Sequence, residues 1–136
     1  MVVSERIATE TVNKWMDFKN IPARKRAEKE TKASIKTIFY AICDGYLTMD
    51  DNHNFVQKLM SPVLDKDGKP VLAQLIFKPR LLLGEVEDAL MNVKSDNGIG
   101  MLRAYASALC GQNSGLLRKL DTDDNKTSQA IVMFFL

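Results

Sequence analysis

Apolar side chains recur every three or four positions over much of this chain, which is the spacing of one face of an α-helix. The first such segment is predicted to begin after Ser4, whose hydroxyl can cap it, and to run to about Lys19. A second helix is predicted over residues 23–43, with Pro22 in its first turn and Gly45 at its end. Its first half is strongly charged and its second half apolar, so it should begin in solvent and end in the core.

The middle of the chain has a different pattern, with two short segments rich in β-branched and aromatic residues, 55–60 and 71–78. The stretch between them, 65–70, combines aspartate, glycine and proline, which is typical of a turn. The pattern therefore predicts a β-hairpin, and two irregular segments are the alternative. Pro79 should end the second strand.

Helical spacing resumes after the hairpin. The predicted segments are helices at 84–94 and 99–110, a short turn at 116–120 and a last helix that runs from 122 to the end. Asp121 or Thr122 can cap the last helix, and two aspartates follow in its first turn, where the helix dipole favours negative charge. The fold class predicted is mainly α (α+β), a compact bundle of about five helices with a small central β-hairpin. A chain of 136 residues points to a single domain over 1–136.

The charge is nearly balanced overall, with a net value of +2, but it is unevenly distributed. Nine Lys and Arg accompany five Asp and Glu up to residue 43, whereas ten accompany twelve after it. The basic excess forms a candidate electrostatic face made up of Arg24, Lys25, Arg26, Lys29 and Lys32. Glutamates interrupt this run and no aromatic residues interleave with it. A solvated helix face with charge pairs is therefore favoured over a nucleic-acid site.

Residues that could carry catalysis or bind a metal are few and scattered. His53 is the only histidine and lies in a polar loop, while the two cysteines lie in apolar helical segments, which does not fit the spacing of zinc ligands. Two acidic stretches, beginning at 65 and 121, lack both the glycine and the closing glutamate of a calcium loop. Residues 98–100 lack the third glycine of a phosphate-binding turn. The sequence therefore predicts a non-enzyme without metal or cofactor.

Neither a secretory signal nor an apolar run close to the roughly 20 residues of a membrane span is found in the sequence. The protein is therefore expected in the cytosol of the cell that makes it, without a membrane partner.

Two groups of apolar residues suggest protein binding. The last seven residues, 130–136, would be apolar on every side of a helix, so they must pack inside the domain or against another chain. Two aromatic residues of the first helix lie away from the main apolar segments, and aromatic residues are favoured at interfaces. Core packing is favoured for both groups, and an interface with another chain is the alternative. The candidate protein-interaction residues are Trp15, Phe18, Ile131, Phe134, Phe135 and Leu136.

The second half of the chain carries a pattern that is specific enough to compare with a family. Its features are Phe77-Lys78-Pro79-Arg80 before a helix, the helical stretch Leu102 to Cys110 followed by Gly111 and a polar loop, Leu117 to Leu120 with Asp121 and Asp124, and the closing Phe134-Phe135-Leu136. This half resembles the tail assembly chaperones of lambda-like siphophages and related long-tailed bacteriophages. The N-terminal helices match that family in length and charge.

The resemblance implies a function. Members of the family are mostly helical, self-associate into oligomers and lack catalysis. They bind the long tape measure protein and keep it soluble in the host cell cytoplasm until tail tube subunits polymerise around it, and they are absent from the mature virion. A longer form, which could also contact the tail tube protein, is often made by ribosomal frameshifting near the end of the short reading frame. Two Phe codons at 134–135 can form the slippery run that frameshifting requires.

Two other functions remain open from the sequence. A small nucleic-acid-binding regulator would use the basic helix around 24–36, although the balanced overall charge argues against it. A structural head–tail connector subunit would stay in mature particles, whereas a chaperone would not.

Overall fold

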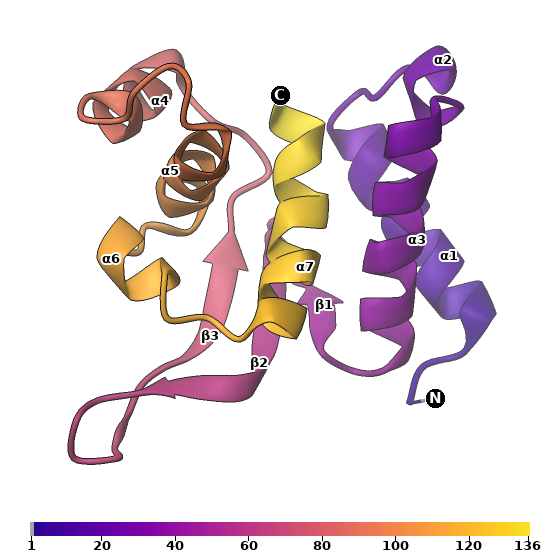
Figure 1. Cartoon of the computed structure of the whole chain (residues 1–136). Coiled ribbons are helices and arrows are strands. Elements are labelled where there is room, and N and C mark those ends of the chain that lie inside the picture. The colour runs from indigo at the N-terminus through magenta and orange to yellow at the C-terminus, as the bar shows by residue number, and fades with distance from the viewer. Residues whose placement is uncertain (1) are drawn as a thin grey trace.

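The computed structural model describes residues 2–136 and confirms a mainly helical α+β fold (Figure 1). Within this range, seven α-helices accompany a three-stranded antiparallel sheet. The helices are α1 (Glu5–Phe18), α2 (Ala23–Arg26), α3 (Lys29–Cys43), α4 (Leu83–Leu90), α5 (Gly98–Cys110), α6 (Ser114–Leu117) and α7 (Thr122–Val132). The strands are β1 (Leu47–Met49), β2 (Phe55–Leu64) and β3 (Pro70–Phe77), and a 3-10 turn, η1 (Met133–Phe135), follows α7.

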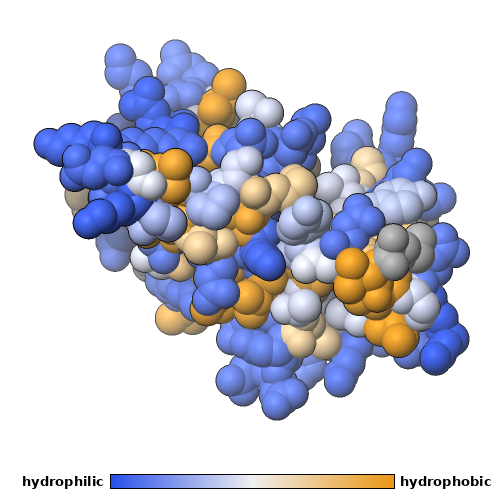
Figure 2. Space-filling model, turned by 90° about the horizontal axis from the view of Figure 1, so that it is seen from below, coloured by the Kyte–Doolittle hydropathy of each residue, from blue (hydrophilic) through white to orange (hydrophobic). Residues whose placement is uncertain are grey.

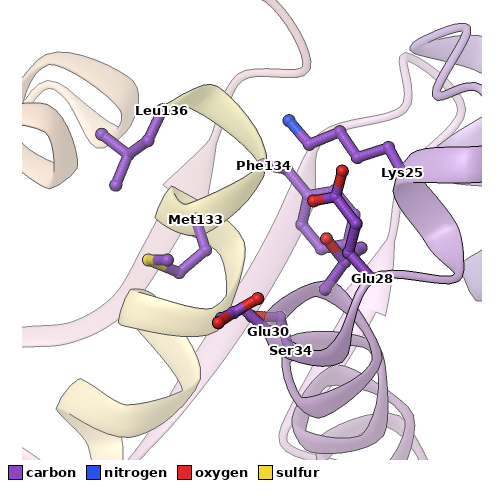
Figure 3. Close-up of a pocket in the computed structure, with 8 residues that line it drawn as sticks. Lys25, Glu28, Glu30, Ser34, Met133, Phe134 and Leu136 are labelled. Carbon is purple, nitrogen blue, oxygen red and sulfur yellow. The ribbon is translucent and has the colours of Figure 1, made fainter.

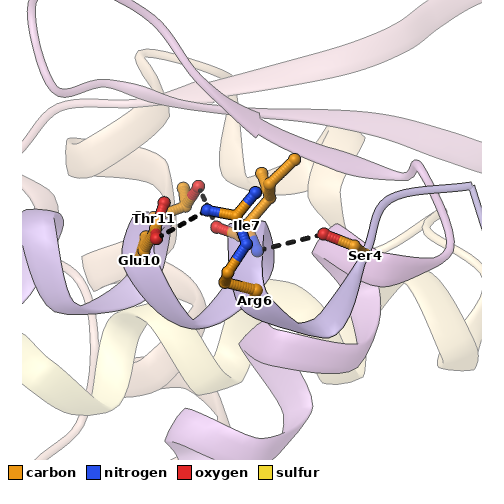
Figure 4. Close-up of polar contacts among 5 residues, drawn as sticks. All are labelled: Ser4, Arg6, Ile7, Glu10 and Thr11. Carbon is orange, nitrogen blue, oxygen red and sulfur yellow. Dashed lines mark hydrogen bonds and ion pairs between the residues drawn. The ribbon is translucent and has the colours of Figure 1, made fainter.

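The first helix forms as its sequence predicts. The Ser4 hydroxyl accepts a hydrogen bond from the backbone N–H of Ile7 at 3.2 Å, which satisfies one of the unpaired donors at the start of α1. Arg6 and Glu10 form an ion pair one turn apart, and the Thr11 hydroxyl donates to the Ile7 carbonyl (Figure 4). The face that α1 buries consists of Ala8, Val12, Trp15 and Met16.

The predicted single helix over 23–43 is divided in two, which corrects the sequence-based boundary. Glu28 takes an extended conformation between α2 and α3, with φ −65° and ψ 145°. Arg26 explains the break, because its guanidinium donates to the Ile21 carbonyl at 2.8 Å and to the Asp17 carboxylate at 2.9 Å. These bonds hold α2 beside the end of α1, and α3 then starts in a new direction.

The predicted hairpin is present as β2 and β3, but it belongs to a larger sheet in the order β1-β2-β3. The short strand β1, which the sequence analysis did not predict, pairs with β2 through Leu47 opposite Gln57. The β2–β3 register is regular from Phe55 to Lys58 and irregular between Lys58 and Val63. β2 therefore extends beyond its predicted end at residue 60 and continues into the hairpin tip.

The remaining helices deviate from the predicted boundaries by a few residues. α4 ends at Leu90 instead of residue 94, and a four-residue helix, α6, occupies 114–117 where a short turn was predicted at 116–120. α5 agrees with its prediction. It ends at Gly111, whose φ of +67° lies in the left-handed region that glycine adopts without steric cost.

The core is centred on α7, which lies against the sheet between α3 and α5 (Figure 1). Ile131 and Val132 of α7 are fully buried, as are the inward-facing strand residues Leu47 and Phe55. The core is a single cluster that also takes side chains from α1, α3 and α5. The last helix is therefore the central element of the fold.

A buried polar network joins α7 to β2. The Asp124 carboxylate accepts hydrogen bonds from the backbone N–H groups of Met60 and Ser61, at 2.8 and 3.1 Å. The Gln57 side-chain amide donates to the Asp124 carbonyl, and the Ser128 hydroxyl donates to the Gln57 side-chain oxygen. Asp124 thus satisfies two donors of β2 at the point where its register with β3 becomes irregular.

Residues 2–136 include no helix that combines the length and the apolar character needed to cross a bilayer.

Candidate functional site

Three of the predicted interface residues lie in the core. Trp15 is 1% exposed, Ile131 is 0% exposed and Phe134 is 5% exposed. The Trp15 ring packs against Phe55 at 4.7 Å between centroids and meets Phe134 edge to face at 5.1 Å. Core packing, which the sequence favoured, therefore describes these side chains, and of the three Phe134 also lines a small pocket.

The other three predicted interface residues are more accessible, but the structure does not gather them into one site. Phe135 is half-buried and lies under the Lys19 ammonium, which is 3.7 Å from its ring centroid. Leu136 is 53% exposed. Phe18 is half-buried and stacks on the imidazole of His53, with 3.9 Å between centroids and 4° between planes.

Lys19 connects the end of α1 to the segment that follows β3. Its ammonium donates to the Pro79 carbonyl at 2.8 Å, and the neighbouring Arg80 guanidinium lies 5.2 Å from the Phe18 ring. Burial is the largest cause that lowers the pKa of Lys19, and together with the nearby charges of Arg80 and Lys25 it brings this pKa to about 8. These contacts hold the linker before α4 against the core, so we assign Lys19 a structural role.

The five residues of the candidate electrostatic face are separated by the break at Glu28. Arg24, Lys25 and Arg26 belong to α2, whereas Lys29 and Lys32 belong to α3. Arg26 is engaged with Asp17 and the backbone, as described above. The structure therefore does not place the five charges along one continuous helix face, which is what a nucleic-acid site of the predicted kind would use.

A small pocket lies beside this region, between the start of α3 and the end of the chain (Figure 3). Its volume is about 160 Å³, and Phe134 and Met133 line it together with Lys25 and Glu28. Pockets that enclose small-molecule ligands usually measure about 300–1,000 Å³. Among residues 2–136, no group of three or more His, Cys, Asp or Glu side chains could hold a metal ion.

Apart from Val2 near the N-terminus, which is 78% exposed, the most exposed large apolar side chains among residues 2–136 come from one stretch of sequence. They are Leu82 at 70%, Leu83 at 74%, Met91 at 73% and Ile99 at 76% exposure, and we call these four residues the 82–99 surface. They belong to α4, its two flanks and the first turn of α5. Sequence reasoning assigned no role to them, although Leu81-Leu82-Leu83 after a strand and a proline was an available signal.

The helix that carries most of this surface is held by polar contacts and by α5. In the part of the chain that the structure describes, none of the α4 residues is buried. Lys78 forms an ion pair with Glu85 in the first turn of α4, and this interaction lowers the pKa of Glu85. The Glu85 carboxylate also accepts from the Leu82 backbone N–H at 3.3 Å. α4 therefore has a fixed position and leaves Leu83 in solvent, while its other apolar residues, Val86, Ala89 and Leu90, are half-buried.

The face of the molecule that is turned away from α4 is largely polar. Figure 1 shows α4 at the top of the molecule, and Figure 2 shows the molecule from below. The face in Figure 2 is largely hydrophilic, with separate apolar areas between polar ones. The 82–99 surface therefore offers a partner accessible apolar side chains. It does not offer titratable groups in a cleft.

No family model, curated protein or solved structure matches this chain.

Proposed function

We propose that this protein is a non-catalytic tail assembly chaperone of a long-tailed bacteriophage, which covers apolar helical segments of a tape measure protein through the 82–99 surface. In this role it keeps the tape measure protein soluble in the host cell cytoplasm until the tail tube polymerises, and it leaves before the virion is mature. The observation that carries the proposal is the exposure of Leu82, Leu83, Met91 and Ile99, each at 70% or more.

The physical basis is burial of apolar surface at many weak sites. Complete burial of a side chain of this size contributes about 1.5–3 kcal/mol. Because the four side chains are still largely in solvent, a partner that covers them recovers most of that free energy, less the cost of association. A tape measure protein is expected to be a long helical rod with apolar stripes, so many copies can bind along it and gain from multivalency.

Release needs no energy source in this mechanism. The polymerising tube displaces the chaperones because it offers the tape measure protein a larger buried surface. A longer frameshifted form of the chain, if the gene encodes one, would add a contact to the tail tube protein at the C-terminal end.

The two alternatives make different demands on the structure. A nucleic-acid-binding regulator needs a continuous basic surface, whereas the basic residues are divided between α2 and α3 and Arg26 is paired with Asp17. A head–tail connector subunit could use the same apolar surface in a permanent interface. Mass spectrometry of purified particles separates that alternative, because a connector is retained in them and a chaperone is absent.

Co-expression with the tape measure protein tests the proposal directly. We expect the wild-type chain to raise the soluble fraction of that protein and the double variant Leu82→Ser/Ile99→Ser to lose most of this effect. The matched control is Met60→Ser/Val71→Ser, which removes two exposed apolar side chains from the β2–β3 hairpin, 46% and 48% exposed. The control should act as the wild type does, with circular dichroism confirming that both variants fold.

A wild-type chain that leaves the tape measure protein insoluble would contradict the proposal. A folded Leu82→Ser/Ile99→Ser variant that works as well as the wild type would exclude the 82–99 surface as the binding site.

A further inference from the structure

α4 presents a row of exposed side chains in which an acidic residue lies between two apolar ones. Leu83, Glu87 and Met91 follow one another at intervals of four residues, so they lie on one face of the helix. Leu83 and Met91 are 74% and 73% exposed, and Glu87 and the adjacent Asp88 are also exposed. This row is amphipathic and negatively charged.

A groove with the opposite charge lies on the other side of the molecule, between α1 and α3. Its volume is about 320 Å³, and it is lined by Val12 of α1 and by Ile35 and Phe39 of α3. Lys32 and Lys36, one turn apart on α3, also line it, and both are exposed. Within residues 2–136, neither lysine forms an ion pair with an acidic side chain.

We propose that α4 of one copy of this protein docks in the α1–α3 groove of a second copy. Leu83 and Met91 would cover the apolar groove residues, while Glu87 and Asp88 would face Lys32 and Lys36. The two surfaces match in both respects that decide specificity, because each combines apolar side chains with charges of opposite sign.

A second copy is required because the two surfaces cannot meet within one chain. Figure 1 shows α4 on the side of α5 and the α1–α3 pair on the opposite side, with α7 between them. α7 contacts both α3 and α5 and is part of the core, so the fold would have to open for α4 to reach its own groove.

The contact is heterologous, since it joins two different surfaces of the same molecule. Repetition of such a contact produces a closed ring or an open chain of copies. Because the charged pairs lie at the solvent-exposed rim, added salt should weaken the assembly. The inference is tested separately from the proposed function, because its test uses the purified protein alone. Leu83 and Met91 also belong to the 82–99 surface, so a copy whose α4 is docked on a second copy leaves Leu82 and Ile99 for the tape measure protein.

Charge reversal on each surface, followed by mixing, tests the contact. One variant is Lys32→Glu/Lys36→Glu, with an acidic groove, and the other is Glu87→Lys/Asp88→Lys, with a basic α4. We expect the wild type to sediment as species larger than the 15.3 kDa chain and each variant alone to sediment as a monomer. An equimolar mixture should restore the larger species, because each variant then meets its complementary surface on the other.

The matched control is Lys66→Glu/Lys69→Glu, which reverses two exposed lysines in the turn between β2 and β3. It should assemble as the wild type does. A wild type that stays monomeric at every concentration overturns the proposal, as does a reversed variant that assembles alone. If mixing restores the larger species, the variants have not lost assembly by unfolding. A mixture of two folded variants that stays monomeric overturns the proposal as well.

Discussion

Helix α7 has a mostly polar sequence but is largely buried, whereas helix α4 has a more apolar sequence but lies at the surface. α7 begins with a polar stretch, Thr-Asp-Asp-Asn-Lys-Thr-Ser-Gln, yet six of its residues are buried, among them Asp124, Thr127 and Ser128. α4 has four apolar residues in eight, Leu83, Val86, Ala89 and Leu90, and in the described structure it buries none. Both helices begin with acidic residues in the first turn, so the difference does not arise at their N-termini.

In these two helices burial follows the position of the helix in the fold and not the composition of the helix. α7 lies over the sheet, where its polar residues find partners in β2, so their burial is not costly. α4 contacts α5 at the edge of the molecule, and no second layer covers it. Its exposed leucines are therefore available for a partner, whereas the apolar end of α7 is used to stabilise the fold.

The greatest change in the free energy of unfolding is expected for a leucine of the core, and a leucine of α4 provides the contrast. Leu75 is 1% exposed and Leu83 is 74% exposed. We expect Leu75→Ala to lower the free energy of unfolding by about 2–5 kcal/mol, because it leaves a cavity in the core. Leu83→Ala should change it by no more than about 0.5 kcal/mol. Urea unfolding followed by circular dichroism measures both, and equal losses would mean that α4 is part of the core.

A smaller effect is expected where α7 is tied to β2. Asp124→Asn removes the charge and leaves one acceptor oxygen, so of the backbone N–H groups of Met60 and Ser61 one keeps a neutral acceptor and the other loses its acceptor. Because hydrogen bonds to charged groups contribute about 1.5–3 kcal/mol, we expect a loss of about this size in the same measurement. Asp123→Asn, at an exposed neighbouring position, is the control and should be close to neutral. A neutral Asp124→Asn would show that the network adds little to the stability of the core.

A still smaller change in the free energy of unfolding is expected from the titration of Lys19, which lies between the core and the linker to α4. Its pKa is lowered from 10.5 to about 8, so between these values the unfolded chain holds a proton that the folded chain has released. The contribution of Lys19 to the free energy of unfolding therefore rises as the pH increases from about 8 to 10.5. We expect the free energy of unfolding of the wild type, minus that of Lys19→Met, to increase from about pH 7 to about pH 10.

Lys14→Met, which replaces an exposed lysine of the same helix, provides the baseline for that measurement. A difference between wild type and Lys19→Met that stays constant or falls over the same pH range would show that the Lys19 amine is not desolvated in the folded state.

Local sequence signals predicted most of the elements but not their limits. The Ser4 cap, the β2–β3 hairpin and the Gly111 end of α5 each depend on residues close together in the chain, and all three are present. The break at Glu28 and strand β1 depend on contacts with distant or neighbouring elements. Arg26 reaches back to Asp17, and three residues of β1 pair with β2, so no local pattern predicted them.

The candidate site was less predictable than the fold. The apolar residues 130–136 had to be buried somewhere, and the sequence left open whether the domain or a partner would cover them. The structure places most of them in the core and leaves the 82–99 surface in solvent instead. Of the five basic residues, Arg24, Lys29 and Lys32 are exposed, whereas Lys25 and Arg26 are half-buried, and the break between α2 and α3 divides the five charges.

Periodicity, caps and turns could all be predicted from the amino-acid order, because they depend on the steric and hydrogen-bonding preferences of adjacent residues. The tertiary structure alone decided which of several apolar segments would occupy the centre of the molecule. The interior has room for only some of the apolar segments, and the packing of the whole chain selects which of them are buried. α7 occupies that interior, and α4, with the more apolar sequence, remains at the surface.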